Sequence, residues 1–310
     1  MTGSILCVSA KPVPEIIEFN DILAVCSSNN DHYFHHNEHC TKKKSKSVNS
    51  SSILDISNIK SCYSFEIHYV TAELPKCKVV TIKFCHSDLS IVTRWIDTLR
   101  QRIERVTNRP KSLLVFVNPF SGRKRGLEIY EKFVEPLFRL ISVRVTLVTT
   151  QRTNHSYDYI MENGWHNVDG IVSVGGDGTF LEMMNGVIAR TAKKSNVDLD
   201  DSRVRIPPPA VRIGVIPAGS TDAIAYSLHG TADIQTAVIH IISGDYMRTD
   251  VCSVHTEKKF LCCFIGLISY GYLGDVIKNS ANLRWMGPMR YDCVGSYIFE
   301  VYKAKPTETD

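Results

Sequence analysis

The stretch Gly175-Gly176-Asp177-Gly178-Thr179-Phe180-Leu181-Glu182 combines residue types that can bind and transfer a phosphate group. It follows a short apolar run at 171–174 and precedes a segment, 183–189, for which we predict a helix. Glycines let the backbone approach an anion closely, and the N–H groups of a turn and of a helix N-terminus attract negative charge. A carboxylate would repel that anion, but Asp177 can take a proton from a nucleophile or hold Mg²⁺ beside phosphates. The stretch therefore predicts a phosphoryl-transfer site.

Similar turns follow other predicted strands. Residues 113–117 are typical of a buried parallel strand, and Asn118-Pro119-Phe120-Ser121-Gly122 separates them from a predicted helix at 126–140. A strand at 143–148 ends at Thr149-Thr150, and one at 213–216 leads into Pro217-Ala218-Gly219-Ser220-Thr221-Asp222 and a further helix. Strands that alternate with helices predict a parallel α/β sheet, in which ligands bind at the carboxyl ends of the strands. The turns can therefore converge on one site.

Each turn also has a purely structural explanation. Asn118 can cap its own loop, and Ser220 with Thr221 can cap the helix that follows. Thr179 and Glu182 have the spacing of a capping box. The chain has neither the GxxxxGK[ST] of a Walker-type ATPase nor a GxGxxG motif. Three turns of this kind in consecutive strand–helix units nevertheless favour a shared phosphate site.

Length and composition set the wider limits. The chain has 310 residues, enough for roughly two domains, and its formal net charge of +4 gives no reason to expect a nucleic-acid partner. No apolar run approaches the ~20 residues of a membrane span. The first residues lack the features of a secretory signal, so the ten cysteines are expected to be reduced thiols in the cytoplasm.

The first hundred residues have a different character, with period-2 strands around 65–69 and 80–84 and an amphipathic helix from 89 to 106 that carries Trp95. This part resembles the second half of a pleckstrin-homology domain, and we predict a partial α+β segment of that kind over 1–107. A polar stretch at 27–52 carries the cluster His32, His35, His36, His39 and Cys40 and a lysine run at 42–46. The cluster can hold zinc and the lysines can contact anionic lipid; the alternative, which we favour, is a solvated loop.

The three turns together resemble the diacylglycerol and sphingolipid kinases. Within that family the finer match is to the ceramide kinases, because the chain has Gly219-Ser220-Thr221-Asp222 where other members usually have Gly-Ser/Thr-Gly-Asn. The segments Ser269-Tyr270-Gly271-Tyr272-Leu273-Gly274-Asp275 and Arg284-Trp285-Met286-Gly287 are also similar to theirs. The resemblance covers roughly residues 19–302. It implies an α/β kinase domain at 110–244, preceded by the segment at 1–107 and followed by the start of a β-rich lipid-binding domain at 245–310.

The resemblance also implies the reaction and the residues that carry it. The γ-phosphate of ATP, with Mg²⁺, passes to the primary hydroxyl of ceramide at a membrane surface to which the protein is peripherally attached. Asp177 would be the general base, and Gly175, Gly176, Gly178 and Asp275 would contact the lipid. The residues that would contact ATP are Asn118, Pro119, Phe120, Thr150, Gln151, Arg152, Thr153, Asn154, Glu182, Gly219, Ser220, Thr221, Arg284 and Arg290. The two late arginines have an alternative role as surface ion-pair partners.

The chain also departs from the family pattern. Ceramide kinases continue through a β-rich domain to a late Asp-Gly-Glu motif, which this sequence lacks. We therefore expect a chain truncated at both ends, in which the last domain has only its first strands, around 246–255 and 259–270, and a helix near 294–302. Two hypotheses of different class follow: a ceramide kinase, with sphingosine or diacylglycerol as alternative substrates, and a non-catalytic chain that binds nucleotide or lipid.

Overall fold

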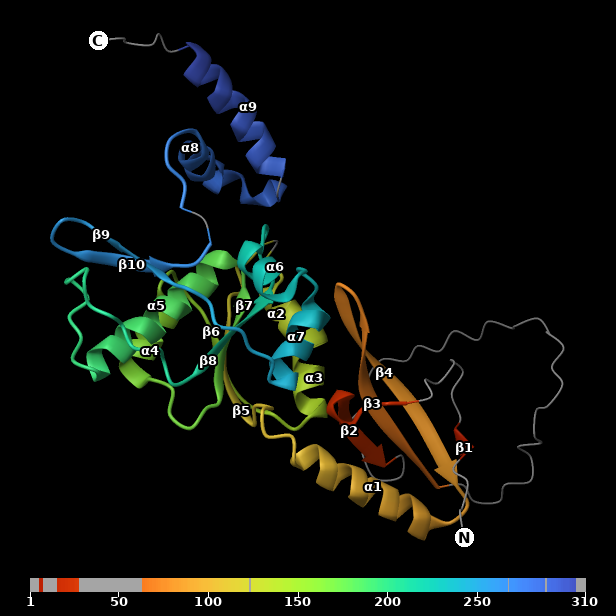
Figure 1. Ribbon diagram of the computed structural model, residues 1–310. Helices are drawn as coiled ribbons and strands as arrows, with labels where there is room; N and C mark the ends of the chain where they lie inside the picture. Colours follow the sequence, from red (N-terminus) through yellow and green to blue (C-terminus); the bar gives the residue numbers. More distant parts are fainter. Residues whose placement is uncertain are drawn as a thin grey trace, which may run out of the picture. The chain divides into compact units, whose positions relative to one another are not determined.

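The computed structural model describes residues 6–7, 16–27, 63–122, 124–266, 268–287 and 289–304 (Figure 1). Two compact units divide the chain: Met1–Thr71 with Lys78–Thr107, and Ala72–Cys77 with Asn108–Asp310. The predicted zinc-binding cluster (His32, His35, His36, His39 and Cys40) and the lysine run at 42–46 lie outside the described residues.

The first unit is an antiparallel sheet with one helix. Its strands pair in the order β1-β4-β3-β2, with β1 at Leu6–Cys7, β2 at Ile22–Ser27, β3 at Tyr63–Glu73 and β4 at Lys76–His86. Helix α1, Leu89–Glu104, begins where the Asp88 carboxylate accepts a hydrogen bond from Ser90 N at 2.8 Å. Its buried stripe shares a core with β3 and β4, as the alternation of apolar residues predicts; that core includes Phe65, Ile67, Ile82, Val92, Ile96 and Leu99. A 3₁₀ turn, η1, Phe19–Asp21, comes just before β2.

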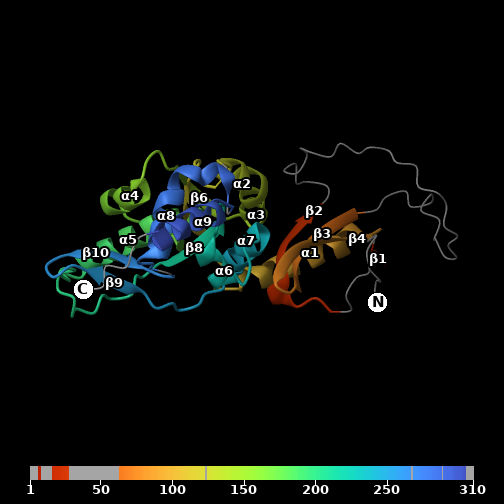
Figure 2. The same ribbon diagram turned by 90° about the horizontal axis from the view of Figure 1, so that it is seen from above.

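The second unit is built on a parallel sheet, which confirms the predicted α/β class. The strand order is β6-β5-β7-β8, with β5 at Ser112–Val117, β6 at Arg144–Thr149, β7 at Gly170–Gly175 and β8 at Arg212–Pro217. Figure 2 labels β6 and β8 of this sheet. In the register, Val117 pairs with both Thr149 and Val174, and Gly175 pairs with Pro217. The carboxyl ends of all four strands are therefore level, and the loops that follow them leave from one edge of the sheet.

Helices connect these strands, and two of them differ from the prediction. The helix expected over 126–140 is three segments: α2, Gly126–Ile129, a π-helical turn η3, Tyr130–Val134, and α3, Glu135–Leu140. Pro136 lies in the first turn of α3 and has no N–H to donate to an earlier carbonyl, which favours the irregular turn before it. The helix expected at 183–189 is α5, Asp177–Lys194, which begins inside the glycine motif. The others are α4, His155–Asn163, α6, Ala223–His229, and α7, Ile234–Ser243.

The last part of the chain adds a hairpin and two helices. Strands β9, Cys252–His255, and β10, Phe260–Phe264, pair antiparallel and are shorter than predicted. The Asn185 side chain of α5 joins this hairpin to the parallel-sheet core, because it donates to Cys263 O at 2.8 Å and accepts from Cys263 N at 2.7 Å.

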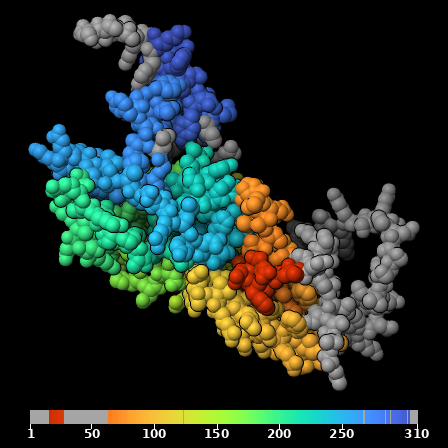
Figure 3. Space-filling model, in the orientation of Figure 1, coloured from red at the N-terminus to blue at the C-terminus, as the bar shows by residue number. Residues whose placement is uncertain are grey.

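Two helices follow that hairpin. Helix α8, Tyr272–Asn279, was not predicted, whereas α9, Met289–Ala304, covers the predicted helix at 294–302 and begins five residues earlier; η4, Ser280–Met286, joins them. In Figure 3 the segment that contains α8, η4 and α9 is blue, and it lies next to the cyan region that contains α6. None of the helices in the described ranges combines the length and the apolar content needed to cross a bilayer.

A pair of buried histidines between α6 and α7 predicts acid sensitivity of this unit. His229 Nε2 lies 3.1 Å from Val215 O, a pure acceptor, so Nε2 carries a proton and Nδ1 accepts from His240 Nδ1 at 3.1 Å. Burial lowers the pKa of His229, and the neighbouring His240 lowers it further. The unfolded chain therefore takes up a proton near pH 6.5 that the folded chain resists, so stability present above that pH is lost as pH falls.

Replacing His229 by Gln is expected to make the fall in unfolding free energy between pH 7 and pH 5 shallower. Urea unfolding at several pH values measures this slope, and His166→Gln, a change at an exposed histidine of the same unit, is the matched control. An unchanged slope in His229→Gln would show that the pair of His229 and His240 does not contribute to the loss of stability between pH 7 and pH 5.

Candidate functional site

The turns after β5, β7 and β8 touch one another, which confirms their predicted convergence. Gly176 N donates to Ser121 Oγ at 2.8 Å, so the first two turns are hydrogen-bonded. A Cβ added to Gly219 would lie 2.5 Å from Gly176 Cα, and one added to Gly122, whose φ is +55°, would lie 2.6 Å from Ala218 O. Only glycine allows backbones to approach this closely. The result is a surface of adjacent backbone turns at the carboxyl edge of the sheet.

Asn118 fixes the first of these turns and ties it to α5. Its Oδ1 accepts from Phe120 N at 2.9 Å, so the predicted structural role as a loop cap is confirmed. Its Nδ2 donates to Thr179 Oγ1 at 2.9 Å. Pro119 lies between these two contacts, and the Phe120 ring is 62% exposed beside them. An exposed aromatic ring on a rigid loop can stack against a flat ligand such as a nucleotide base.

Asp177 stands at the centre of the site. The carboxylate accepts hydrogen bonds from two backbone N–H groups in the first turn of α6, Ile224 N at 2.8 Å and Ala223 N at 3.2 Å. Asp177 is itself the first residue of α5 and is half-buried. Backbone donors hold the side chain in one orientation without a salt bridge, which is the preorganisation that proton transfer requires. Gly178 follows it in an open position, with no atom within 4 Å of an added Cβ.

Asp222 provides a second carboxylate, which the sequence reasoning did not single out. Both of its oxygens accept from Gly219 N, at 2.8 and 3.1 Å, and its backbone has a φ of +50°. The pKa of Asp222 is raised to about 6, mainly by burial; the Gly219 N–H opposes this shift and the nearby Asp177 charge adds to it. The signal available in the sequence was its place in the same turn as Gly219 and Ser220.

Glu182 links α5 to the loop after β6 and does not form the predicted capping box. Its Oε2 accepts from Asn154 N at 2.9 Å, while Thr179 is bonded to Asn118. Thr179 lies inside α5, whose N-cap is Gly176, so the spacing that suggested the box falls within the helix. Burial raises the pKa of the Glu182 carboxyl, the Asn154 N–H opposes this shift, and Asp158 adds to it.

The loop between β6 and α4 carries other predicted nucleotide residues. Thr150 is buried, and its N–H donates to Val117 O at 2.9 Å, next to the turn of Asn118. Gln151 N donates to His155 Nδ1 at 3.0 Å, which holds the loop against α4. Arg152, next to Thr153, is in an ion pair with Asp158 at 2.6 Å. The loop is therefore ordered by its own contacts and presents exposed polar groups.

Arg290, at the start of α9, reaches the turn after β8. It is 8% exposed; its Nη1 donates to Ser220 Oγ at 3.2 Å and its Nη2 donates to Tyr291 OH at 2.5 Å. Among the residues with described coordinates, no carboxylate pairs with it, and its buried Nε has no hydrogen-bond partner. The alternative role of Arg290 as a surface ion-pair partner does not fit this burial.

Two other predicted residues come from the same end of the chain. Asp275 lies half-buried in the first turn of α8. Arg284 belongs to η4, and its side chain lies outside the described part of the structure. Their roles stay predictions.

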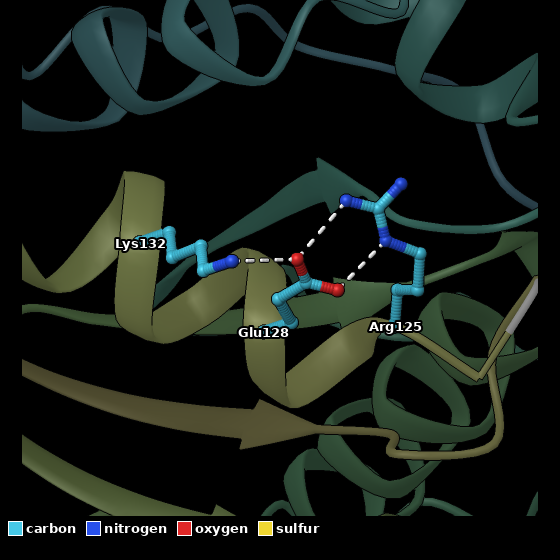
Figure 4. A network of polar contacts seen from close by, with 3 residues as sticks. All are labelled: Arg125, Glu128 and Lys132. Atoms are coloured by element: carbon cyan, nitrogen blue, oxygen red, sulfur yellow. Dashed lines mark hydrogen bonds and ion pairs between the residues drawn. The ribbon is translucent and has the colours of Figure 1, made fainter.

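A surface ion network accounts for two nearby cations, Arg125 just before α2 and Lys132 in η3. Glu128 Oε2 lies 2.8 Å from Arg125 Nε, and Glu128 Oε1 lies 2.9 Å from Lys132 Nζ (Figure 4). Hydrogen bonds from Arg125 and then Lys132 lower the pKa of Glu128 to about 2. These two cations are paired on the exposed face of the helix, in contrast to the buried guanidinium of Arg290.

The site has the features that polyphosphate and Mg²⁺ require. The glycine turns leave no room for side chains, and the buried Arg290 Nε lacks an acceptor that an anion would supply. No group of three or more metal-binding side chains occurs within the described ranges. Mg²⁺ at kinase sites typically needs only one or two carboxylates besides phosphates and water, and Asp177 and Asp222 meet that need.

Known proteins are similar to this chain in sequence. Residues 112–254 match the model of the diacylglycerol kinase catalytic domain. The chain is 41% identical to the ceramide kinase of Homo sapiens over 238 residues, which are 76% of this chain and 44% of the human protein. It is 42% identical to the ceramide kinase of Mus musculus over the same share of this chain and 45% of the mouse protein. The chain therefore spans somewhat less than half the length of these curated relatives.

Solved structures give a more distant likeness. A diacylglycerol kinase of Bacillus anthracis matches 47% of this chain and 42% of its own, at 23% sequence identity and a TM-score of 0.33.

Proposed function

Residues 112–254 of the chain belong to the diacylglycerol kinase catalytic domain family, and on that premise we propose that the protein phosphorylates ceramide. The γ-phosphate of ATP passes to the primary hydroxyl of the lipid and gives ceramide 1-phosphate and ADP. The identity to ceramide kinases of human and mouse supports ceramide over sphingosine or diacylglycerol as the acceptor. The chain covers less than half the length of these relatives, so their activity comes to it as a proposal.

The observation that carries the proposal is the fixed carboxylate of Asp177 among three phosphate-type turns. A primary alcohol is a poor nucleophile until a base receives its proton as the new bond forms. In the proposed reaction the lipid oxygen bonds to the γ-phosphorus and the bond from that phosphorus to the β,γ-bridging oxygen breaks. The lipid proton passes to Asp177, whose orientation the Ala223 and Ile224 N–H groups fix.

The other residues of the site bind and orient the nucleotide. The backbone turns of Gly176 and Gly219 and the hydroxyls of Ser220 and Thr221 contact the phosphates, and the Arg290 guanidinium balances their charge. Asn118-Pro119-Phe120 and the loop from Thr150 to Asn154, held by Glu182, contact the nucleoside. Mg²⁺, held by Asp222 together with phosphate oxygens, would neutralise charge on the transferring group.

We also propose how the parts of the chain share this work. The antiparallel unit is a partial pleckstrin-homology-like segment over 1–107, the kinase domain spans 110–244, and 245–310 begins a β-rich lipid-binding domain. Asp275, in that last part, contacts the sphingoid head. The protein works in the cytoplasm, attached peripherally to the membrane that contains its lipid.

The purified chain, given labelled ATP, Mg²⁺ and one lipid at a time, tests this function. We expect labelled ceramide 1-phosphate to form at least ~10-fold faster than the products of sphingosine or diacylglycerol, because pocket contacts discriminate by 1–3 kcal/mol. A preference for diacylglycerol or sphingosine would refute the ceramide assignment. Binding of ATP without transfer to any of the three lipids would favour the non-catalytic hypothesis for this chain.

A further inference from the structure

Four polar groups from two distant segments meet at the turn after β8. Arg290 Nη2 donates to Tyr291 OH, and Tyr291 OH lies 3.3 Å from Thr221 Oγ1. Arg290 Nη1 donates to Ser220 Oγ. The Arg290 guanidinium also lies over the Tyr291 ring, with Cζ 4.5 Å from the ring centroid. Side chains seventy residues apart are thereby joined in one network.

The chemistry of the donors fixes the direction of these hydrogen bonds. An arginine side chain has only donors, so the Tyr291 oxygen accepts from Arg290 and its own proton is free to go to Thr221 Oγ1. Ser220 Oγ likewise accepts from Arg290. Both hydroxyls of the turn then receive a hydrogen bond from α9, and both keep their own hydrogens for an acceptor elsewhere.

In this arrangement one nitrogen of the guanidinium, Nε, has no hydrogen-bond partner among the described residues. Arg290 is more than nine-tenths buried. Buried polar groups are hydrogen-bonded in the great majority of folded proteins, so an orphaned cationic donor indicates an absent acceptor. The donors available around the turn are Arg290 Nε and the hydroxyls of Ser220 and Thr221, and an anion would satisfy them.

We propose that Tyr291 is a positioning residue for nucleotide binding: its hydroxyl and ring hold the Arg290 guanidinium against the Ser220-Thr221 turn so that arginine and hydroxyls present their donors to one phosphate group. It acts through Arg290 and does not itself contact the nucleotide. It makes the nucleotide site dependent on α9. This inference rests on the proposed function in one respect, namely that the anion is a phosphate of ATP.

Tyr291→Phe removes the hydroxyl and keeps the ring. We expect the Kd for ATP, measured by titration calorimetry without lipid, to rise about 10- to 150-fold, the range that loss of one hydrogen bond involving a charged group gives. The KM for ATP should rise in parallel, while kcat at saturating ATP stays within about twofold, since no contact with the reacting atoms is lost. Tyr297→Phe makes the same change on the exposed face of α9 and is expected to bind ATP as the parent chain does.

A double-mutant cycle separates positioning from a purely structural role. In an Arg290→Lys background, which lacks the planar fork, Tyr291→Phe should weaken ATP binding little further. Equal losses in both backgrounds would overturn the inference, and so would a Tyr291→Phe chain that binds ATP like the parent. If Tyr291→Phe does not fold, Thr221→Ser keeps a hydroxyl partner and Thr221→Val removes it; equal ATP affinity of these two chains would contradict the network.

The outcome for the inference is separable from the outcome for the proposed function. ATP binding that depends on Tyr291, without transfer to ceramide, would refute the proposed function alone. Absence of ATP binding by the parent chain would refute both.

Discussion

A chain in which Asn replaces Asp177 is expected to phosphorylate ceramide ~10²- to 10⁴-fold more slowly than the parent chain. The side-chain oxygen of Asn can still accept from the α6 N–H groups, so the geometry of the site is retained in part. What is lost is a group that can receive the lipid proton. The measurement is the initial rate of labelled ceramide 1-phosphate formation at saturating ATP and lipid.

The same chain should still bind ATP, and this separates loss of the base from loss of the site. We expect a Kd for ATP within about threefold of the parent value, because the turns, Arg290 and the hydroxyls are unchanged. Asp198→Asn, at an exposed position of the loop after α5, is the matched control and should retain full activity. A rate for Asp177→Asn close to that of the parent chain would show that another group takes the proton.

Much of the site could be predicted because its residues lie close together in the sequence. Each turn follows an apolar run long enough for a buried strand, and the parallel α/β pattern places the ends of such strands at one edge. The contacts of Gly176 with Ser121 and Gly219 follow from that rule. The period-2 alternation at Phe65 and Ile67 and the helical stripe at Val92 and Ile96 likewise predicted the core of the first unit.

What could not be predicted depends on groups distant in the chain or on local choices of backbone. The contact of Tyr291 with Thr221 spans seventy residues, and no local pattern indicates it. Thr179 and Glu182 fit a capping box by spacing, but α5 begins at Asp177 because an extended Gly176 already starts the helix. Once Thr179 lies within the helix, its hydroxyl and the Glu182 carboxylate turn to Asn118 and Asn154. The spacing of Thr179 and Glu182 alone does not reveal that α5 begins earlier, at Asp177.

Replacing Gly219 by Ala is expected to impair the site strongly. The new Cβ would lie 2.5 Å from Gly176 Cα and 2.6 Å from Asp222 Oδ1, so backbone as well as a buried carboxylate would have to move. Overpacking of this kind costs about 1–3 kcal/mol of stability. The Gly219 N–H, which donates to both Asp222 oxygens, would shift when the backbone moves. We expect ATP binding to weaken at least ~10-fold, since the turns would no longer meet in the arrangement that phosphate needs.

The glycines of the motif supply the matched control for this change. An alanine Cβ at Gly178 would meet no atom within 4 Å, and the residue lies in the first turn of α5, where alanine is the better helix former by up to about 1 kcal/mol. Gly178→Ala should therefore unfold at the same or a higher denaturant concentration than the parent chain and bind ATP normally. Gly219→Ala should unfold at a lower denaturant concentration and bind ATP more weakly. If the two chains behaved alike, close backbone approach between the turns would not be what the glycines provide. Gly178 follows β7, and Gly219 follows the neighbouring strand β8. Opposite behaviour of the two alanine variants would show that nucleotide binding depends on the contact between Gly176 and Gly219.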